Sequence, residues 1–128
     1  MKPFIFILSF LIATACTKGT GVSPETIVGK WKLVKLETTS DNKYAHELTQ
    51  INQKLYANEV FEFTADGLLI YSERSVHYKI TSEPHLIIEE GFLMAHNEKM
   101  SAHIQDKTLT IIEINEEGDE FVETFIKY

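Results

Sequence analysis

The stretch VFEFTADGLLIYSE at residues 60–73 decides the fold class of this chain. Two runs rich in large apolar residues, 60–64 and 68–73, lie on either side of Ala65-Asp66-Gly67. An Asp-Gly pair supplies the positive φ angle that tight hairpin turns require. The stretch therefore predicts two antiparallel strands joined by a short turn.

The length of that turn decides which side chains of the hairpin meet. With a three-residue loop, Phe63 faces Leu69 and Phe61 faces Tyr71, so that four large apolar side chains share one surface. A two-residue loop pairs them differently.

Short alternating runs continue along the chain and predict further strands. They lie at 31–37, 76–81, 86–89, 99–105, 108–115 and 120–127, with 92–95 as the place of an optional short strand. One interruption is helical, because Tyr44, Leu48, Ile51 and Leu55 recur at spacings of four, three and four. We expect a helix over 43–57, with Ser40, Asp41 or Asn42 as its N-cap.

About eight short strands with few residues between them favour an antiparallel up-and-down meander that closes into a barrel. A chain of 128 residues, 44% hydrophobic and 11% aromatic, has material for one core and no room for a second domain. Its formal charge of −7 makes nucleic acid an unfavourable partner.

The first fifteen residues have the pattern of a signal peptide. Lys2 precedes an apolar run over 4–12, and three small residues, Ala13-Thr14-Ala15, follow it. A membrane span needs about 20 apolar residues, so this run is too short to remain as one. We expect it to be cleaved.

Cys16 directly follows these small residues, and 13–16 resembles the lipobox of bacterial lipoproteins, although Ala13 stands where that family usually has Leu or Val. The resemblance implies that Cys16 becomes the new N-terminus and carries fatty acyl chains such as palmitate. The alternative is an ordinary secretory signal that leaves a free thiol. As the single cysteine of the chain, Cys16 has no intrachain disulfide partner.

The domain boundaries follow from these features. Residues 1–15 are the predicted signal peptide, 16–23 the lipidated cysteine with a flexible tether, and 24–128 the barrel domain. Thr17 stands where some Gram-negative lipoproteins carry an Asp that retains them in the inner membrane. This favours the bacterial cell envelope, at the outer membrane, as the location.

Two segments of the predicted domain resemble the lipocalins and related calycins. Gly29-Lys30-Trp31 at the start of the first strand is similar to their G-x-W signature, and 61–67 resembles the second-strand hairpin of bacterial lipocalin-like lipoproteins. The resemblance implies a small barrel in which Trp31 packs across one end under a basic side chain of the last strand, here Lys127. The chain is short for a lipocalin, and its helix lies between the first two predicted strands, as the lid of fatty-acid-binding proteins does.

No motif in the chain supports catalysis, a metal site or a bound cofactor. His46-Glu47 begins like a zinc-protease helix, but Gln50 occupies the place of the second ligand. The pairs Glu89-Glu90 and Glu116-Glu117 read as solvated charge, because adjacent strand residues point to opposite faces. An enzyme in the barrel would need a buried carboxylate or histidine with a perturbed pKa beside a cavity, and the sequence names none.

The leading hypothesis is a lipid-anchored, non-enzymatic, lipocalin-like protein that binds a small hydrophobic ligand. The candidate ligand-binding residues are the aromatic side chains Trp31, Phe61, Phe63, Tyr71 and Tyr78, although a barrel filled by its own side chains explains them equally well. The alternative is a solid barrel that contacts an envelope protein, which an exposed apolar patch would distinguish.

Overall fold

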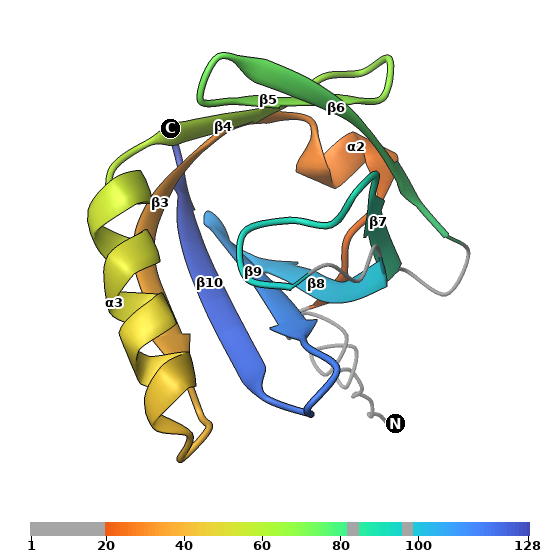
Figure 1. Ribbon diagram of the computed structural model, residues 1–128. Coiled ribbons are helices and arrows are strands. Elements are labelled where there is room, and N and C mark those ends of the chain that lie inside the picture. Colours follow the sequence, from red (N-terminus) through yellow and green to blue (C-terminus); the bar gives the residue numbers. More distant parts are fainter. Residues whose placement is uncertain (1–19, 82–84, 96–98) are drawn as a thin grey trace, which may run out of the picture.

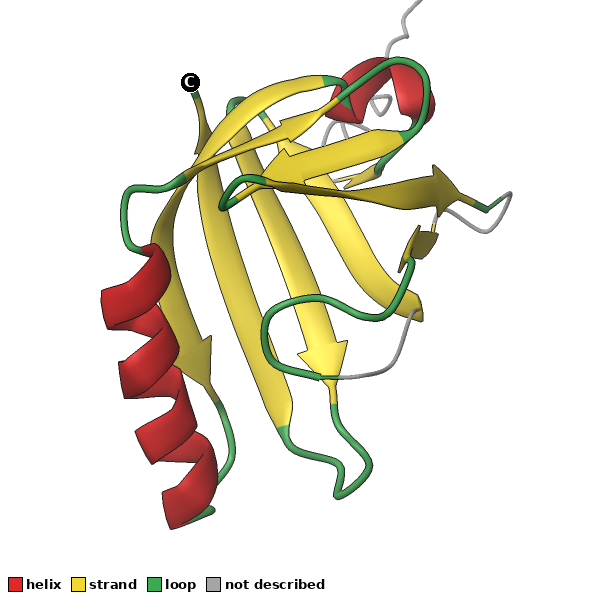
Figure 2. Cartoon of the chain, turned by 45° about the horizontal axis from the view of Figure 1, so that its top comes forward, coloured by secondary structure: helices red, strands yellow, loops and turns green. Residues whose placement is uncertain are grey.

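The structure is a computed structural model that describes residues 20–81, 85–95 and 99–128. Its strands form one antiparallel sheet, and pairing of β8 with β9 closes β3 to β10 into an eight-stranded barrel (Figures 1 and 2). The strands are β2 (Thr20–Gly21), β3 (Gly29–Thr38), β4 (Val60–Phe63), β5 (Leu68–Tyr71), β6 (Arg74–Ile80), β7 (His85–Ile88), β8 (Lys99–Gln105), β9 (Thr108–Ile114) and β10 (Glu120–Lys127). The predicted mainly β, up-and-down barrel is confirmed.

The hairpin that decided the fold class has the three-residue loop. Thr64 and Leu68 close it through a backbone hydrogen bond of 2.8 Å, and Gly67 has a φ of 92°. Phe63 pairs with Leu69, and the rings of Phe61 and Tyr71 stack with centroids 4.8 Å apart. The predicted pairing of these four side chains is confirmed.

The predicted signal peptide and Cys16 lie outside the described residues. The last part of the predicted tether, from Thr20 on, lies against the barrel: β2 pairs with β8, and Val22 is buried. Ser23 then caps the short helix α2 (Pro24–Ile27) by accepting a hydrogen bond from the Thr26 N–H. The folded part of the chain therefore begins before Pro24.

Helix α2 and the last strand close one end of the barrel around Trp31. The indole N–H donates to the Ile27 carbonyl oxygen at 2.8 Å, and the Lys127 ammonium lies 4.6 Å from the centre of the Trp31 ring. The arrangement that the resemblance implied for Trp31 and Lys127 is present.

Helix α3 (Lys43–Tyr56) begins at the expected residue, with Asn42 as its N-cap, and lies along β3 (Figure 1). The expected apolar face is not the face that it buries. The buried residues are Ala45, Thr49 and Asn52, whereas Tyr44, Ile51 and Leu55 are exposed. At 100° per residue, the two faces are about a quarter turn apart.

Local hydrogen bonds explain why a polar face can pack on the sheet. The Thr49 hydroxyl donates to the Ala45 carbonyl oxygen at 2.8 Å. The Asn52 side-chain amide donates to the Leu48 carbonyl oxygen at 3.0 Å. Both side chains are therefore satisfied within the helix. Ala45 is small enough to let the helix approach the barrel closely.

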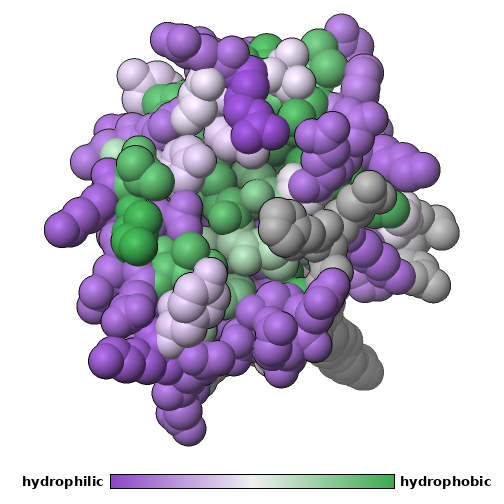
Figure 3. Space-filling model, viewed as in Figure 1, coloured by the Kyte–Doolittle hydropathy of each residue, from purple (hydrophilic) through white to green (hydrophobic). Residues whose placement is uncertain are grey.

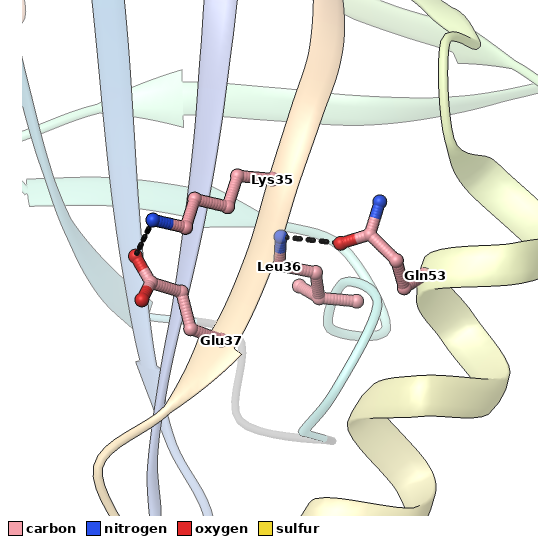
Figure 4. A network of polar contacts seen from close by, with 4 residues as sticks. All are labelled: Lys35, Leu36, Glu37 and Gln53. Carbon is pink, nitrogen blue, oxygen red and sulfur yellow. Dashed lines mark hydrogen bonds and ion pairs between the residues drawn. The ribbon is translucent and has the colours of Figure 1, made fainter.

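The helix also replaces a missing strand partner. β4 pairs with β3 only along Gly29–Lys32, so the later part of β3 has no strand on that side. The Leu36 N–H donates instead to the side-chain oxygen of Gln53 at 2.8 Å, while Lys35 forms an ion pair with Glu37 at 3.6 Å (Figure 4). Helix α3 thus completes the barrel wall.

Candidate functional site

The five aromatic side chains predicted to line a ligand site lie together in the barrel. Trp31, Phe61, Phe63 and Tyr71 are 2%, 0%, 0% and 4% exposed, and Tyr78 is half-buried. A cavity large enough to hold a water molecule would leave part of its wall residues accessible to solvent. Phe61 and Phe63 have no accessible surface, so the space beside them is filled by other side chains. The predicted walls form a packed aromatic cluster in this conformation.

Part of that packing comes from a loop. Residues 92–95, where an optional strand was expected, form a loop between β7 and β8 that runs across β9 (Figure 2). Phe92 has ring contacts with Phe61 and Tyr71, both at 5.7 Å, and with Phe125 at 6.3 Å. Because a loop side chain can leave without breaking a strand ladder, Phe92 is the removable part of the cluster.

Two carboxyl groups that sequence reasoning missed lie beneath this loop. Glu113 on β9 and Glu123 on β10 are 1% and 0% exposed and point into the barrel. Their registers place Glu113 opposite Phe121 and Glu123 opposite Ile111, so they are diagonal neighbours on one face.

A signal for this pair exists in the sequence. Glu113 continues the inward alternation of Leu109 and Ile111, and Glu123 stands between Phe121 and Phe125 in the same phase. A carboxylate in phase with buried residues predicts burial. The adjacent acidic pairs Glu89-Glu90 and Glu116-Glu117 are exposed, as predicted.

The two carboxyl groups have different hydrogen-bond partners. Glu113 accepts hydrogen bonds from the backbone N–H groups of Met94 and Ala95, each at 3.1 Å. Neither oxygen of Glu123 has a donor among the described residues while both groups are ionised. A hydrogen bond can join the two carboxyls only when one of them carries a proton.

Their pKa values are displaced in the direction that burial dictates. Burial, followed by the neighbouring charge of Glu113, raises the pKa of Glu123 well above its ordinary value of 4.5. Burial also raises the pKa of Glu113, while hydrogen bonds from Glu123 and from the loop N–H groups oppose that shift. Both shifts favour retention of a proton by the pair.

No basic side chain is buried with the pair in the part of the chain that the structure describes. The buried polar and charged side chains there are Thr49, Asn52, Glu113 and Glu123. The charge of Glu113 also reaches Tyr71: burial raises the pKa of Tyr71, the charge of Arg74 opposes that rise, and the charge of Glu113 adds to it.

A groove of about 340 Å³ lies directly outside the loop. Its floor includes Met94 and Ala95, the residues whose N–H groups bind Glu113. The backbone of these two residues therefore separates the groove from the buried pair. The other residues along the groove are Tyr44, Leu48, Asn115, Glu116 and Glu117, a set with acidic but no basic members.

A second surface feature lies on α3. Tyr44, Ile51 and Leu55, on one side of the helix, are 66%, 56% and 65% exposed. Hydrophobic side chains are visible over α3 and in the middle of the face in Figure 3. A groove of about 390 Å³ between α3 and β3 borders this stripe at Ile51.

Within residues 20–81, 85–95 and 99–128, no cluster of three or more His, Cys, Asp or Glu side chains is placed to hold a metal ion. Within the same residues, no helix has the length and apolar character needed to span a membrane.

The buried pair meets half of the condition set for an enzyme, namely a buried carboxyl with a raised pKa. The 92–95 loop lies between the pair and the groove, because its Met94 and Ala95 N–H groups bind Glu113 on one side and line the groove on the other.

Comparison of the chain with models of known protein families, with curated proteins and with solved structures gave no match.

Proposed function

We propose that this protein is a lipid-anchored, non-enzymatic, lipocalin-like protein of the bacterial cell envelope that binds a small hydrophobic ligand inside its barrel. The observation that carries the proposal is Phe92. It is a partly buried loop side chain that packs against the buried rings of Phe61, Tyr71 and Phe125, and a flat apolar ligand of similar size can replace it there.

The anchoring part of the proposal rests on the sequence of residues 1–16. With β2 beginning at Thr20, the chain from Cys16 to the barrel spans four residue steps, about 14 Å at full extension. A lipid on Cys16 would therefore hold the barrel close to the membrane surface. Two or more acyl chains make such an anchor stable.

The anchor can be tested in the native host. The full chain should cofractionate with membranes and carry the added mass of acyl chains, and Cys16→Ser should lose both properties. Membrane association of Cys16→Ser, or an unmodified mass for the membrane-bound native chain, would contradict lipidation.

The ligand can be sought in protein taken from its own membranes. The full chain, extracted in mild detergent, should show by native mass spectrometry an adduct that is released on denaturation and identified by chromatography. Phe92→Ala should retain more of the adduct, because it removes the side chain that competes for the site. Bare protein in both cases argues for a permanently filled barrel.

A second candidate function is favoured by the exposed stripe on α3. A solid barrel that contacts another envelope protein requires an exposed apolar patch, and Tyr44, Ile51 and Leu55 form one. A photo-crosslinking residue at position 51 should then capture one defined envelope protein in living cells, and the same residue at exposed Lys79 should not.

A further inference from the structure

We propose that the ligand of this barrel carries a cationic amino group, which the Glu113–Glu123 pair binds when the 92–95 loop moves aside. This inference rests on the proposed ligand-binding function and names the chemical class of the ligand. Three features carry it: the unused acceptors of the pair, the absence of a buried cation in the described chain, and the acidic groove at the entrance.

The carboxyl oxygens of the pair are enough for all three donors of an ammonium group. Displacement of the loop removes the Met94 and Ala95 N–H groups from Glu113 and frees both of its oxygens. In the ionised pair, both buried oxygens of Glu123 lack a donor among the described residues. An ammonium brings three N–H donors and no acceptor, so it can serve both carboxyls at once.

The charge also matches. Two carboxyls are buried together, and no Lys or Arg is among the buried side chains of the described residues. Buried charges in proteins are normally paired, because an isolated one loses its hydration. A cationic ligand supplies the missing partner, and Glu116 and Glu117 at the groove attract it toward the entrance.

The surroundings of the pair select the rest of the ligand. Leu36, Met94 and Phe121 form an apolar cluster near the pair, and Phe92 connects this region with Phe61 and Tyr71. A hydrocarbon or aromatic body can take the place of Phe92 while its amino group reaches the carboxyls. The inferred ligand is thus an apolar primary amine.

A divalent metal ion is a poorer match for the same residues. Calcium and magnesium prefer six or more oxygen ligands, and the described chain places no third acidic or histidine side chain with this pair. The arrangement therefore favours an ammonium group over a metal ion.

The test compares three probes of one carbon skeleton. Hexylamine, 1-hexanol and hexanoate are titrated into the full chain in mild detergent by calorimetry, with protein-free micelles as the blank. Hexylamine is protonated at neutral pH, as a lysine side chain is. It should bind at least about tenfold more tightly than 1-hexanol, and hexanoate should bind most weakly.

Variants assign that preference to the pair. Glu123→Gln, which keeps the shape of a protonated carboxyl, should reduce the preference for hexylamine, and Glu113→Gln/Glu123→Gln should abolish it. Glu47→Gln, at an exposed position on α3, should leave it unchanged. If the double variant does not fold, Glu123→Gln alone decides.

The outcomes separate this inference from the proposed function. Equal binding of hexylamine and 1-hexanol, or a preference that survives in the Gln variants, overturns the amine inference and leaves a hydrophobic ligand site. Binding of none of the probes, to either the native chain or Phe92→Ala, removes the ligand-binding function and the inference together.

Discussion

The Lys127 ammonium lies 4.6 Å from the centre of the Trp31 ring and donates to the Val28 carbonyl oxygen at 3.1 Å. Strand β10 is thereby held against β3 and against Val28, the residue that precedes β3. Trp31 itself is only 2% exposed, so this cation closes the barrel end over an otherwise buried ring.

Replacement of this cation should weaken the barrel end modestly. Lys127→Met keeps an apolar stem over Trp31 but removes the charge, and should lower the free energy of unfolding by about 1 kcal/mol. Denaturant unfolding followed by Trp31 fluorescence measures it. Lys30→Met, at an exposed position on the same end, is the matched control and should change stability little.

Gly29 should resist any side chain, for two separable reasons. Its φ of 134° is strained for other residues, and an added Cβ would collide with the Lys127 ammonium. Gly29→Ala should therefore cost about 1–3 kcal/mol. Combined with Lys127→Ala, the cost should be less than the sum of the two single changes, because the collision is gone. Strict additivity would mean that the backbone angle accounts for the whole effect.

The strands were predictable because their signals are local. Asp66-Gly67 marks the hairpin whatever the rest of the chain does, and the bounds expected for β8 and β10 are those observed. The helix bounds were also nearly right, ending at Tyr56 where Ala57 was expected. Turn chemistry and alternation suffice for such elements.

The face of α3 and the carboxyl pair depend on tertiary structure instead. Apolar spacing identified Tyr44, Ile51 and Leu55 as one face, but the barrel accepts the face with Ala45 because it permits close packing. Glu113 and Glu123 meet only through the β9–β10 register, and the loop that covers them carries no periodic signal. Local alternation signals the burial of each carboxyl, but it cannot show that the two meet, that a loop covers them, or which face of α3 packs on the barrel.

Neutralising Glu123 should stabilise the protein, and more so at higher pH. The native pKa of Glu123 is raised, so above about pH 4.5 the native state holds more protons than the unfolded state, and stability falls as pH rises. Glu123→Gln removes this loss. We expect it to be about 1–3 kcal/mol more stable than the native chain at pH 8, and nearly equal to it at pH 4.5.

A carboxyl with the opposite shift provides the control for that pH profile. Hydrogen bonds from Ser40, then from Asn115 and Asn42, lower the pKa of Asp119. Asp119→Asn should therefore destabilise the protein at neutral pH, and its effect should vanish as pH falls below the ordinary value of 3.8. A Glu123→Gln effect that follows this second pattern would show that Glu123 is ionised and paired.

The loop over the barrel should depend on Glu113 for its order. Glu113→Ala removes both acceptors for the Met94 and Ala95 N–H groups, each a hydrogen bond to a charged group. Hydrogen exchange at these two amides should become at least about tenfold faster. Amides of Leu109 and Ile111 in β9 should keep their rates, and a parallel increase there would indicate general loosening of the barrel.

The exposed stripe on α3 gives the most direct check on how that helix lies. Ile51→Lys and Leu55→Lys should each change the free energy of unfolding by no more than about 0.5 kcal/mol, because both side chains are more than half exposed. Ala45→Lys, at a position with no exposure, should cost about 3 kcal/mol or more. The reverse order of effects would mean that the helix buries the face predicted from its apolar spacing.

If the stripe serves a partner, the same two lysine substitutions should abolish crosslinking from position 44 without lowering stability, which separates a binding role from a structural one.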